Sequence, residues 1–406
     1  MKLSMLPGKP HLGYCSNIHA GETLAEIEAG LRQHLPLLRQ HLQASGVLAP
    51  RAPLGLGLRL SAQAAAALQA SVTLQEFAAL LDNLGAYVFS INAFPYGEFH
   101  RKPVKQQVYE PDWSSSQRVR YSSDCARVLA SLSPLGEAGS ISTVPLGWRN
   151  ASPDHERIAA MLPQLQAAVL ALVQVEREAG QRICLALEPE PGCLLENGAD
   201  ALDFFRQYWL AASNLRQLAQ LLHCNINQAE RIARRHLGLC FDVCHSAVEF
   251  EEPRQILQQA QDLGVSVAKI QLSNALRIPA MHAQLAPQLQ GFDDGVYLHQ
   301  VVRRQHASLL RDNDLPQALA SASAEWPQQE WRIHCHVPLF WEGEAQIGPT
   351  RQELRQTLSL LREQAISPHL EIETYTWDVL PPALRGMHKA EAIAREFEYV
   401  YRELQS

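Results

Sequence analysis

Several features that identify large classes of protein are missing from this sequence. No uninterrupted apolar run approaches the ~18 residues of a membrane span, and the N-terminus shows neither the long apolar stretch nor the cleavage site of a signal peptide. Basic residues are not in excess, because 35 Lys and Arg stand against 42 Asp and Glu, a net charge of −7. That balance argues against a protein that binds nucleic-acid phosphates. We therefore expect a cytoplasmic protein that binds no nucleic acid.

Cysteine spacing and glycine motifs exclude further classes. The eight cysteines form no Cys-x-x-Cys and lie mostly within apolar stretches, which predicts buried thiols in a reducing compartment rather than a disulfide framework. No Gly-x-Gly-x-x-Gly follows a strand, and no Gly-x-x-x-x-Gly-Lys-Ser/Thr occurs, so the nucleotide signatures of open α/β sheets are missing. What remains is 406 residues, 47% of them hydrophobic, enough for a large core.

Short apolar runs rich in strand formers alternate with long amphipathic segments along the whole chain. Such alternation predicts a parallel sheet, because parallel strands need a crossover connection. Polar residues follow many of the strands, and a closed (β/α)₈ barrel brings all those ends to one site, whereas a doubly wound sheet, the other option, does not. The predicted strands are Leu12–Ile18, Leu54–Leu60, Ala86–Ile91, Ser140–Leu146, Arg182–Glu188, Leu237–Asp242, Val267–Ser273, Trp331–Val337 and His369–Thr374.

Nine predicted strands exceed the eight of a barrel, so one lies outside it. Val267–Ser273 and Trp331–Val337 both qualify as the seventh barrel strand. We favour the former, with Trp331–Val337 folding back toward the mouth as an excursion. Residues 95–121, 193–235 and 275–330 are too long for plain connections and are expected to be insertions that wall the mouth. With no repeat or low-complexity linker, residues 1–406 are predicted to form one TIM-barrel domain.

Helix signals lie between these strands. Thr73-Leu-Gln-Glu76 and Thr350-Arg-Gln-Glu353 have the form of capping boxes, and Ser152-Pro153 has that of an N-cap followed by proline. Gly180 and Gly264 stand where helices should end.

Strand alternation decides which polar side chains face the barrel axis. In Ile183-Cys-Leu-Ala-Leu-Glu188 the large aliphatic residues share one face, which leaves Glu188 inside at the end of its strand. The same reasoning points a further set of polar residues inward: Asp242, Lys269, Gln271, Ser273, His334, His336, Glu371 and Glu373.

Carboxylates at the ends of apolar strands are costly to bury without partners. A shared cation would join them, and the mixture of oxygen and imidazole donors suits Mn²⁺, Mg²⁺, Co²⁺ or Zn²⁺. The alternative is that Glu188 and Glu373 pair with interior Lys269 or with an arginine. Asp242-Val-Cys-His245 places an aspartate ligand next to an imidazole, and Cys240 and Cys244 are expected to be structural thiols. The candidate metal ligands are Glu188, Asp242, His334, His336 and Glu373, and the candidate catalytic residues are Glu188, His245 and Glu373.

Residues after the other strands suit a small polar or polyhydroxylated substrate. The candidates for substrate binding are Asn17, His19, Asn92, Tyr96, Trp148 and Gln271. Asn and His supply hydrogen bonds and Trp an aromatic wall, although the same residue types also serve as turn and capping residues. Asp112-Trp113 and the Arg118–Tyr121 stretch could shape a lid or bind an anion.

The motifs resemble a known superfamily. Glu188 in Ala-Leu-Glu-Pro-Glu-Pro-Gly, Phe-Asp-Val-Cys-His at 241–245 and Glu373 after the last strand resemble the xylose isomerase-like TIM barrels, which include sugar isomerases, ketose 3-epimerases and endonuclease IV. Within that group the chain is similar to the EboE family, encoded in ebo gene clusters. The blocks that carry this second resemblance are Gly-Tyr-Cys-Ser-Asn-Ile-His at 13–19, Asn-Ala-Phe-Pro-Tyr-Gly-Glu-Phe-His at 92–100, Val-Tyr-Glu-Pro-Asp-Trp at 108–113 and His-Cys-His-Val-Pro at 334–338.

The resemblance implies a divalent metal held by Glu, Asp, His and Glu from strands five to eight, with the two glutamates exchanging a substrate proton. Glu188, Asp242 and Glu373 match these positions. Gln271 stands in place of the histidine, and His336 or His334 could replace it. The EboE resemblance implies a role in metabolite traffic, with a membrane-protein partner from the same gene cluster.

Three functions follow from these observations. The leading one is a metal-dependent isomerase or epimerase acting on a small polyhydroxylated or carbonyl metabolite. The second is a non-catalytic metabolite-binding or trafficking protein, which the missing histidine favours. The third is an endonuclease IV-like phosphodiesterase, which the net charge disfavours.

Overall fold

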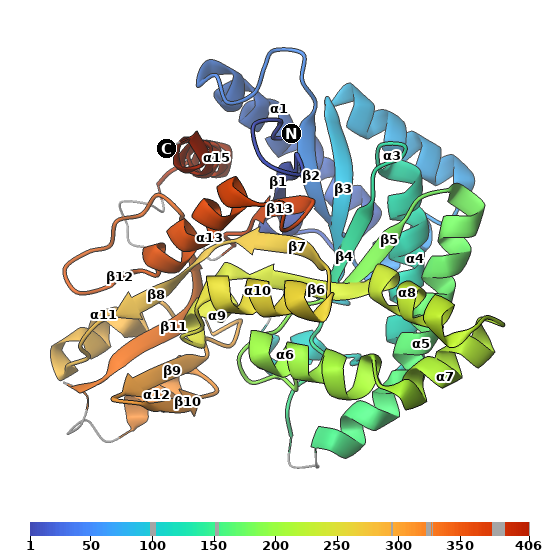
Figure 1. The fold of residues 1–406 in the computed structure, drawn as a ribbon. Helices are drawn as coiled ribbons and strands as arrows, with labels where there is room; N and C mark the ends of the chain where they lie inside the picture. Colours follow the sequence, from blue (N-terminus) through green and yellow to red (C-terminus); the bar gives the residue numbers. More distant parts are fainter. Residues whose placement is uncertain are drawn as a thin grey trace.

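Eight parallel strands close into a barrel in the order β1-β13-β7-β6-β5-β4-β3-β2 (Figure 1). The computed structural model describes residues 1–97, 103–150, 154–293, 295–321, 326, 328–375 and 386–405. The barrel strands are β1 (His11–Cys15), β2 (Leu54–Arg59), β3 (Ala86–Asn92), β4 (Gly139–Thr143), β5 (Ile183–Leu187), β6 (Leu237–Asp242), β7 (Val267–Leu272) and β13 (His369–Ile372). The predicted α/β barrel is confirmed, and its seventh strand is the favoured Val267 segment.

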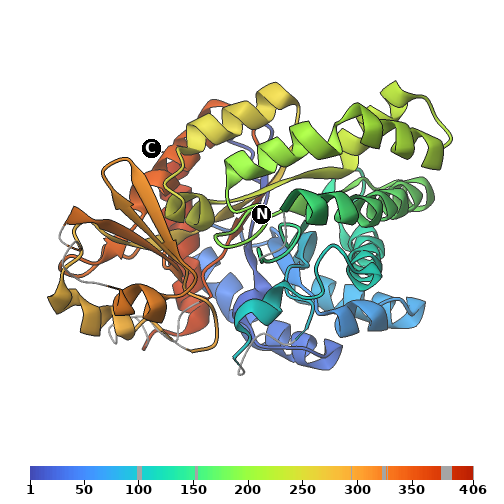
Figure 2. The same ribbon diagram turned by 90° about the horizontal axis from the view of Figure 1, so that it is seen from below.

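Helices surround the barrel on its outside (Figures 1 and 2). They are α1 (Leu24–Ala44), α2 (Ala62–Ala67), α3 (Ser71–Asn83), α4 (Ser116–Leu132), α5 (Asp154–Ala179), α6 (Gly198–Phe204), α7 (Ala212–Leu221), α8 (Ile226–His236), α9 (Val243–Val248), α10 (Pro253–Leu263), α13 (Arg351–Glu363) and α15 (Lys389–Gln405). Of the helices in the described part of the chain, α5 alone has the length and hydropathy of a membrane span, and half of its most apolar stretch is buried. It packs against α4, α8 and β5, as a barrel crossover helix does.

A second, antiparallel sheet stands beside the barrel, in the strand order β10-β9-β11-β8-β12 (Figures 1 and 2). Its strands are β8 (Asn274–Ile278), β9 (Val301–Gln305), β10 (Ser308–Asp312), β11 (Glu330–Val337) and β12 (Gly348–Pro349), accompanied by the short helices α11 (Ala286–Gln290) and α12 (Leu315–Ala320). The whole excursion lies between β7 and β13 in the sequence. The ninth predicted strand, Trp331–Val337, therefore lies outside the barrel in β11, as expected.

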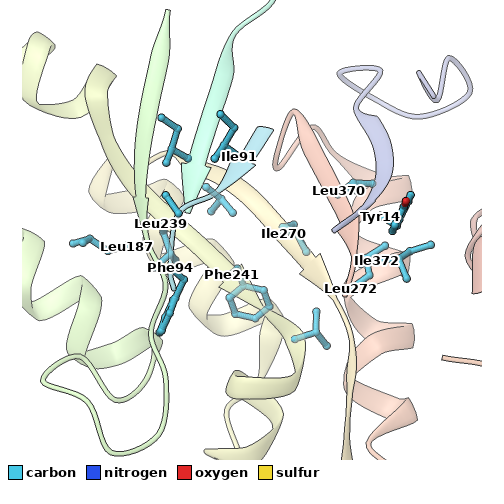
Figure 3. Packing of buried hydrophobic residues seen from close by; sticks show 14 of the residues in the cluster. Tyr14, Ile91, Phe94, Leu187, Leu239, Phe241, Ile270, Leu272, Leu370 and Ile372 are labelled. Atoms are coloured by element: carbon cyan, nitrogen blue, oxygen red, sulfur yellow. The ribbon is translucent and has the colours of Figure 1, made fainter. Parts of the chain in front are cut away.

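The barrel strands bury aliphatic side chains against the helices. Leu187, Leu239, Phe241, Ile270 and Leu272 belong to one large hydrophobic cluster that includes buried residues of the surrounding helices (Figure 3). Their neighbours in the sequence point the other way, into the barrel, because strand side chains alternate between faces. The two-residue period thus separates an apolar outer face from a polar interior.

The barrel interior contains polar side chains in layers, beside a small apolar cluster of Cys184, Ala186, Cys240 and Ala268. The fully buried Lys269 and Glu371 form an ion pair with Nζ and Oε1 2.9 Å apart, and the hydroxyls of Ser142 and Ser90 contact this pair. Gly57 makes room for it, because a Cβ there would stand 2.3 Å from the Glu371 carboxylate. The layer above, at the carboxyl ends of the strands, holds the candidate site.

Candidate functional site

Three buried carboxylates meet at the mouth of the barrel. Glu188 follows β5, Asp242 ends β6 and Glu373 follows β13, and one oxygen of each lies within 4.8 Å of the others. Gln271 of β7 stands between them: its Nε2 lies 3.1 Å from Glu188 Oε1 and 3.0 Å from Asp242 Oδ2, and it also contacts Glu373 Oε2. The structure therefore brings these side chains together at the barrel mouth, as the sequence predicts.

Two asparagines complete the surroundings of Glu373. Asn17, in the 3₁₀ turn after β1 (Ser16–Ile18), donates to Glu373 Oε1 at 2.5 Å, and Asn92 at the end of β3 donates to the same oxygen at 3.1 Å. Both were predicted to bind substrate, and both lie at the site.

The amide of Gln271 has too few hydrogens for the three carboxylates that it contacts. An amide NH₂ carries two hydrogens, so Gln271 cannot donate to three ionised carboxylates at once. Among the described residues Glu188 Oε2 has no hydrogen-bond partner although it is buried. Lys269 does not supply the missing positive charge, since its ammonium pairs with Glu371 in the layer below. The alternative in which Lys269 pairs with Glu188 or Glu373 is thus not found.

Burial and mutual repulsion move the pKa values of these carboxyls apart. Burial, with the Asp242 charge, raises the pKa of Glu188 to about 7. Burial, with the charges of Glu188 and Asp242, raises the pKa of Glu373 well above its usual range. Burial also opposes ionisation of Asp242, but His245, His336 and the hydrogen bond from Ser273 outweigh it and lower its pKa. An oxygen-rich group whose three carboxyls share one amide donor and which holds an orphaned buried oxygen fits a hard divalent cation.

Three imidazoles form a second group next to the carboxylates. His245 lies on α9, directly after Asp242, while His334 and His336 lie on β11 of the antiparallel sheet. The Nε2 atoms of His245 and His334 are 3.1 Å apart, and those of His334 and His336 are 3.2 Å apart. All three rings are buried.

The charge state of the imidazoles differs from ring to ring. Burial lowers the pKa of His334 well below its usual value, and that of His336 to about 4. Burial also disfavours the charged form of His245, but the Asp242, Glu190 and Glu188 carboxylates outweigh it and raise its pKa. His245 is therefore the ring of this group that most readily holds a proton.

Both groups open into one pocket at the mouth of the barrel. The candidate residues that line it are Asn17, Asn92, Glu188, His245, His334, His336 and Glu373. Asp242 and Gln271 lie beneath them, bonded to their side chains. Polar groups from several strands converge on it, as they do in sites that bind small ligands.

Sequence reasoning missed part of the pocket wall. Tyr109, Glu190, Tyr297 and Tyr375 also line the pocket, and the Tyr109 hydroxyl donates to Glu190 Oε1 at 2.7 Å. Glu190 could have been found, because it follows Glu188 by two residues in Glu-Pro-Glu-Pro. Tyr109 belongs to a 3₁₀ turn (Lys105–Tyr109) within a predicted insertion, where no periodicity indicates direction.

Besides Gln271, three predicted substrate-binding residues do not line the pocket. His19 accepts or donates a bond with the Tyr14 hydroxyl at 3.1 Å and stacks on His34. Tyr96 packs edge-on against Tyr121. Trp148 lies behind Tyr109, with ring centroids 4.9 Å apart.

The Arg118 segment has a structural role rather than an anion-binding one. Arg118 is fully buried and donates to the backbone oxygens of Ala93, Phe94 and Pro111. Asp112 is paired with Arg157 at 3.2 Å. Residues 98–100 of the 92–100 block, and Ser152-Pro153, lie outside the described residues.

No protein-family model and no curated protein matches this sequence. Solved structures similar to it include the IOLI protein with a bound zinc atom, at 12% identity over 97% of this chain and 98% of that chain, with a TM-score of 0.48. The probable 3-DHS dehydratase AsbF of petrobactin synthesis from Bacillus anthracis matches at 11% identity over 96% and 98% of the chains, with a TM-score of 0.44. A D-tagatose 3-epimerase-like protein matches at 11% identity over 98% and 100%, with a TM-score of 0.42. At such identities the likeness concerns the fold alone.

Proposed function

We propose that this chain is a divalent-metal-dependent enzyme of the isomerase or epimerase type, which moves a proton on a small polyhydroxylated or carbonyl metabolite. The observation that carries this proposal is the pair Glu188 and Glu373. Both line the pocket, both are buried, and both have raised pKa values while Asp242 between them stays ionised.

A carboxyl group with a pKa near neutrality can both accept and return a proton at physiological pH. Glu188 has a pKa of about 7, which suits a general base, and the pKa of Glu373 is raised well above its usual range, which suits a general acid. The two come from β5 and β13, which are separated by β6 and β7 in the barrel. Both carboxyls line the pocket from different strands, so a substrate there can contact each of them.

Of the five predicted metal ligands, the carboxylates Glu188, Asp242 and Glu373 would hold the metal that this reaction needs. Bound there, a divalent cation would polarise adjacent substrate oxygens and lower the cost of removing a proton from the neighbouring carbon. Asn17 and Asn92 fix the orientation of Glu373 through its Oε1, which leaves its other oxygen toward Gln271. His245 is placed to stabilise the charge of Asp242, whose Oδ1 accepts from the His245 backbone N–H at 3.1 Å.

Solvent exchange tests the proposal with a panel of compounds, so the substrate need not be identified first. The protein with Mn²⁺, Mg²⁺, Co²⁺ or Zn²⁺ is incubated in D₂O with ketoses, aldoses and cyclic polyol ketones, and mass spectrometry follows deuterium incorporation at carbon. We expect exchange in the wild type and its loss in Glu188→Gln and Glu373→Gln. Glu342→Gln, whose side chain is largely exposed, serves as the matched control. Wild-type exchange rates in Glu188→Gln would contradict the proposal.

A second candidate function is metabolite binding without turnover. Gln271 supports it, because an amide replaces the imidazole that the resemblance implies at this position, and its Nε2 faces the carboxylates. This function predicts that a panel compound binds tightly, by calorimetry, while no deuterium enters it.

The EboE resemblance extends either function to metabolite traffic. We propose a cytoplasmic protein that passes its small-molecule ligand to a membrane-protein partner of the same gene cluster and binds no nucleic acid. Pull-down of the tagged chain with each membrane protein of the cluster tests this role, and absence of binding to all of them would rule it out.

A further inference from the structure

We propose that His245, His334 and His336 form a second metal site, separate from the carboxylate group, that binds a Zn²⁺- or Co²⁺-type ion through their three Nε2 atoms. This site goes beyond the proposed function, which needs a metal at the carboxylates only. It rests on the arrangement of hydrogens around the three rings.

The proton of two rings is fixed by backbone carbonyls. His245 Nδ1 is 2.9 Å from the oxygen of Pro189, and His336 Nδ1 is 2.8 Å from the oxygen of Glu373. A carbonyl oxygen can only accept, so each Nδ1 carries the hydrogen. In a neutral ring the Nε2 atom then bears a lone pair.

The position of the ring hydrogen on His334 is set by Gln300, and a further hydrogen bond of Gln300 determines the orientation of its amide. His334 Nδ1 is 2.7 Å from Gln300 Oε1. Gln300 Nε2 donates to the Pro191 carbonyl at 3.0 Å, which leaves Oε1 as the atom that faces His334. His334 Nδ1 therefore also donates, and its Nε2 also bears a lone pair when the ring is neutral.

Two lone pairs facing each other do not attract. The Nε2 atoms are nevertheless 3.1 Å apart between His245 and His334 and 3.2 Å apart between His334 and His336. Nitrogens bound to one tetrahedral zinc ion at about 2.0–2.1 Å lie about 3.3 Å from each other. The spacing of these two pairs is therefore close to that of imidazoles sharing one metal ion, and the Nδ1–H···O bonds match the support that metal-bound histidines receive.

Two carboxylates lie close enough to supply a fourth ligand to a metal ion held by the imidazoles. Asp242 lies within 4.8 Å of donor atoms of His245 and His336, and Glu190 within 4.8 Å of those of His245 and His334. Three imidazoles and one carboxylate favour Zn²⁺ or Co²⁺ over Mg²⁺, in contrast to the all-oxygen carboxylate group. The two groups share Asp242, so two ions would stand side by side facing the same pocket.

A proton is the competing occupant. If His245 is an imidazolium, its Nε2–H donates to His334 Nε2 and accounts for that one distance without a metal. The two occupants differ in measurable ways: a metal adds to the ion count and leaves each Nε2 deprotonated, whereas a proton does neither.

Metal counting and X-ray absorption test the site directly. Purified full-length protein is equilibrated with Zn²⁺ or Co²⁺, freed of excess ion and analysed by mass spectrometry of the metal. We expect His334→Gln and His336→Gln each to bind about one ion per chain fewer than the wild type. Glu373→Gln should keep the imidazole-bound ion. Absorption fine structure of the Co²⁺ or Zn²⁺ wild type should contain imidazole scattering, and this measurement needs no variant.

Controls separate loss of metal from loss of fold. His236→Gln is matched, because His236 is buried and its Nδ1 likewise faces a carbonyl, that of Ile183 at 2.9 Å, yet the ring contacts Glu176 away from the pocket. It should bind as many ions as the wild type. Equal ion counts in wild type and His334→Gln, or a spectrum without imidazole scattering, would overturn the second site. Nitrogen-15 NMR showing a doubly protonated His245 in the presence of Zn²⁺ would overturn it in favour of the proton. Glu188→Gln is expected to lose proton exchange while it keeps all three imidazoles, so failure of the proposed function is recognised separately from failure of the second site.

Discussion

Asp242 and Glu373 belong to one group of buried carboxyls, yet their pKa values move in opposite directions. Asp242 Oδ1 accepts from two backbone N–H groups at the start of α9 and from the Ser273 hydroxyl. Glu373 receives only amide hydrogens and faces two other carboxylates. Hydrogen bonds to the charged form favour it, and like charges disfavour it. The immediate neighbours of each carboxyl thus decide whether its charged or its protonated form is favoured.

Glu188 makes the metal-free protein less stable as pH rises. Its pKa is about 7 in the fold against 4.5 for an ordinary glutamate, so between these values the folded protein holds the extra proton. The free energy of unfolding then falls with rising pH across this window and levels off above it. Buried histidines with lowered pKa values act in the opposite direction, so the wild-type profile alone does not isolate Glu188.

Comparison with Glu188→Gln removes the histidine contribution. In chelator, the melting temperature of Glu188→Gln minus that of wild type should grow more positive from about pH 4.5 to about pH 7. Differential scanning calorimetry measures it, and a difference that does not depend on pH would show that Glu188 titrates normally.

The Lys269–Glu371 pair predicts a large loss of stability when one partner is removed. Both side chains are fully buried, so Lys269→Met leaves an unpaired carboxylate inside the barrel and should cost about 3–5 kcal/mol. The double variant Lys269→Met/Glu371→Met removes both charges and should recover most of that loss. Urea unfolding measures both, and a double variant as unstable as the single one would contradict this account.

Among the helices and strands, the strand ends supply the site residues, and α4 holds the segment that follows β3 in place. Arg118 of α4 bonds the backbone oxygens that follow β3, next to the pocket residues Asn92 and Phe94. This clamp connects a helix on the outside to the rim of the pocket.

Removal of the clamp should weaken both stability and ligand binding. Arg118→Met leaves buried carbonyls without donors, at about 1–3 kcal/mol for each unsatisfied group, and frees the segment that carries Phe94. Arg120→Met, an exposed neighbour on the same helix, is the control. Chemical unfolding and calorimetric titration with Mn²⁺ and a bound panel compound provide the readouts. Unchanged stability in Arg118→Met would refute the clamp.

Helix ends show where local signals succeed. Gly264 caps α10 in the left-handed conformation (φ 69°), and Gly180, with the same φ, follows the end of α5, as predicted. The capping box at Thr73 is wrong, since α3 begins at Ser71 and its cap makes no side-chain bond. Thr350 does precede α13, but its hydroxyl accepts from the Ala275 backbone instead. Tertiary partners compete for the same side-chain oxygens that a local box would use.

For the whole molecule, the carboxylates at the mouth make metal binding a source of stability. A ligand that binds only the folded state at a hundred times its Kd adds about 2.7 kcal/mol. Chelator should therefore lower the melting temperature of protein purified without it, and Mn²⁺ or Zn²⁺ should restore it. In the double variant Glu188→Gln/Glu373→Gln the response to Mn²⁺ should disappear. A melting temperature that ignores both chelator and metal would contradict a bound cation.

The sequence alone determined which strand side chains face the barrel interior, because this depends only on the two-residue alternation along a strand. Because strand side chains alternate, the position of Glu188, Asp242, Gln271 and Glu373 at strand ends was enough to place them together inside a barrel. Only the tertiary structure decided which partners they have: that Lys269 pairs one layer below, that Gln271 lacks hydrogens for three carboxylates, and that β11 brings two imidazoles to His245. His19, Tyr96 and Trp148 follow strands as well, but they lie in connections without a period. Their direction is set by packing against distant segments, which no local pattern encodes.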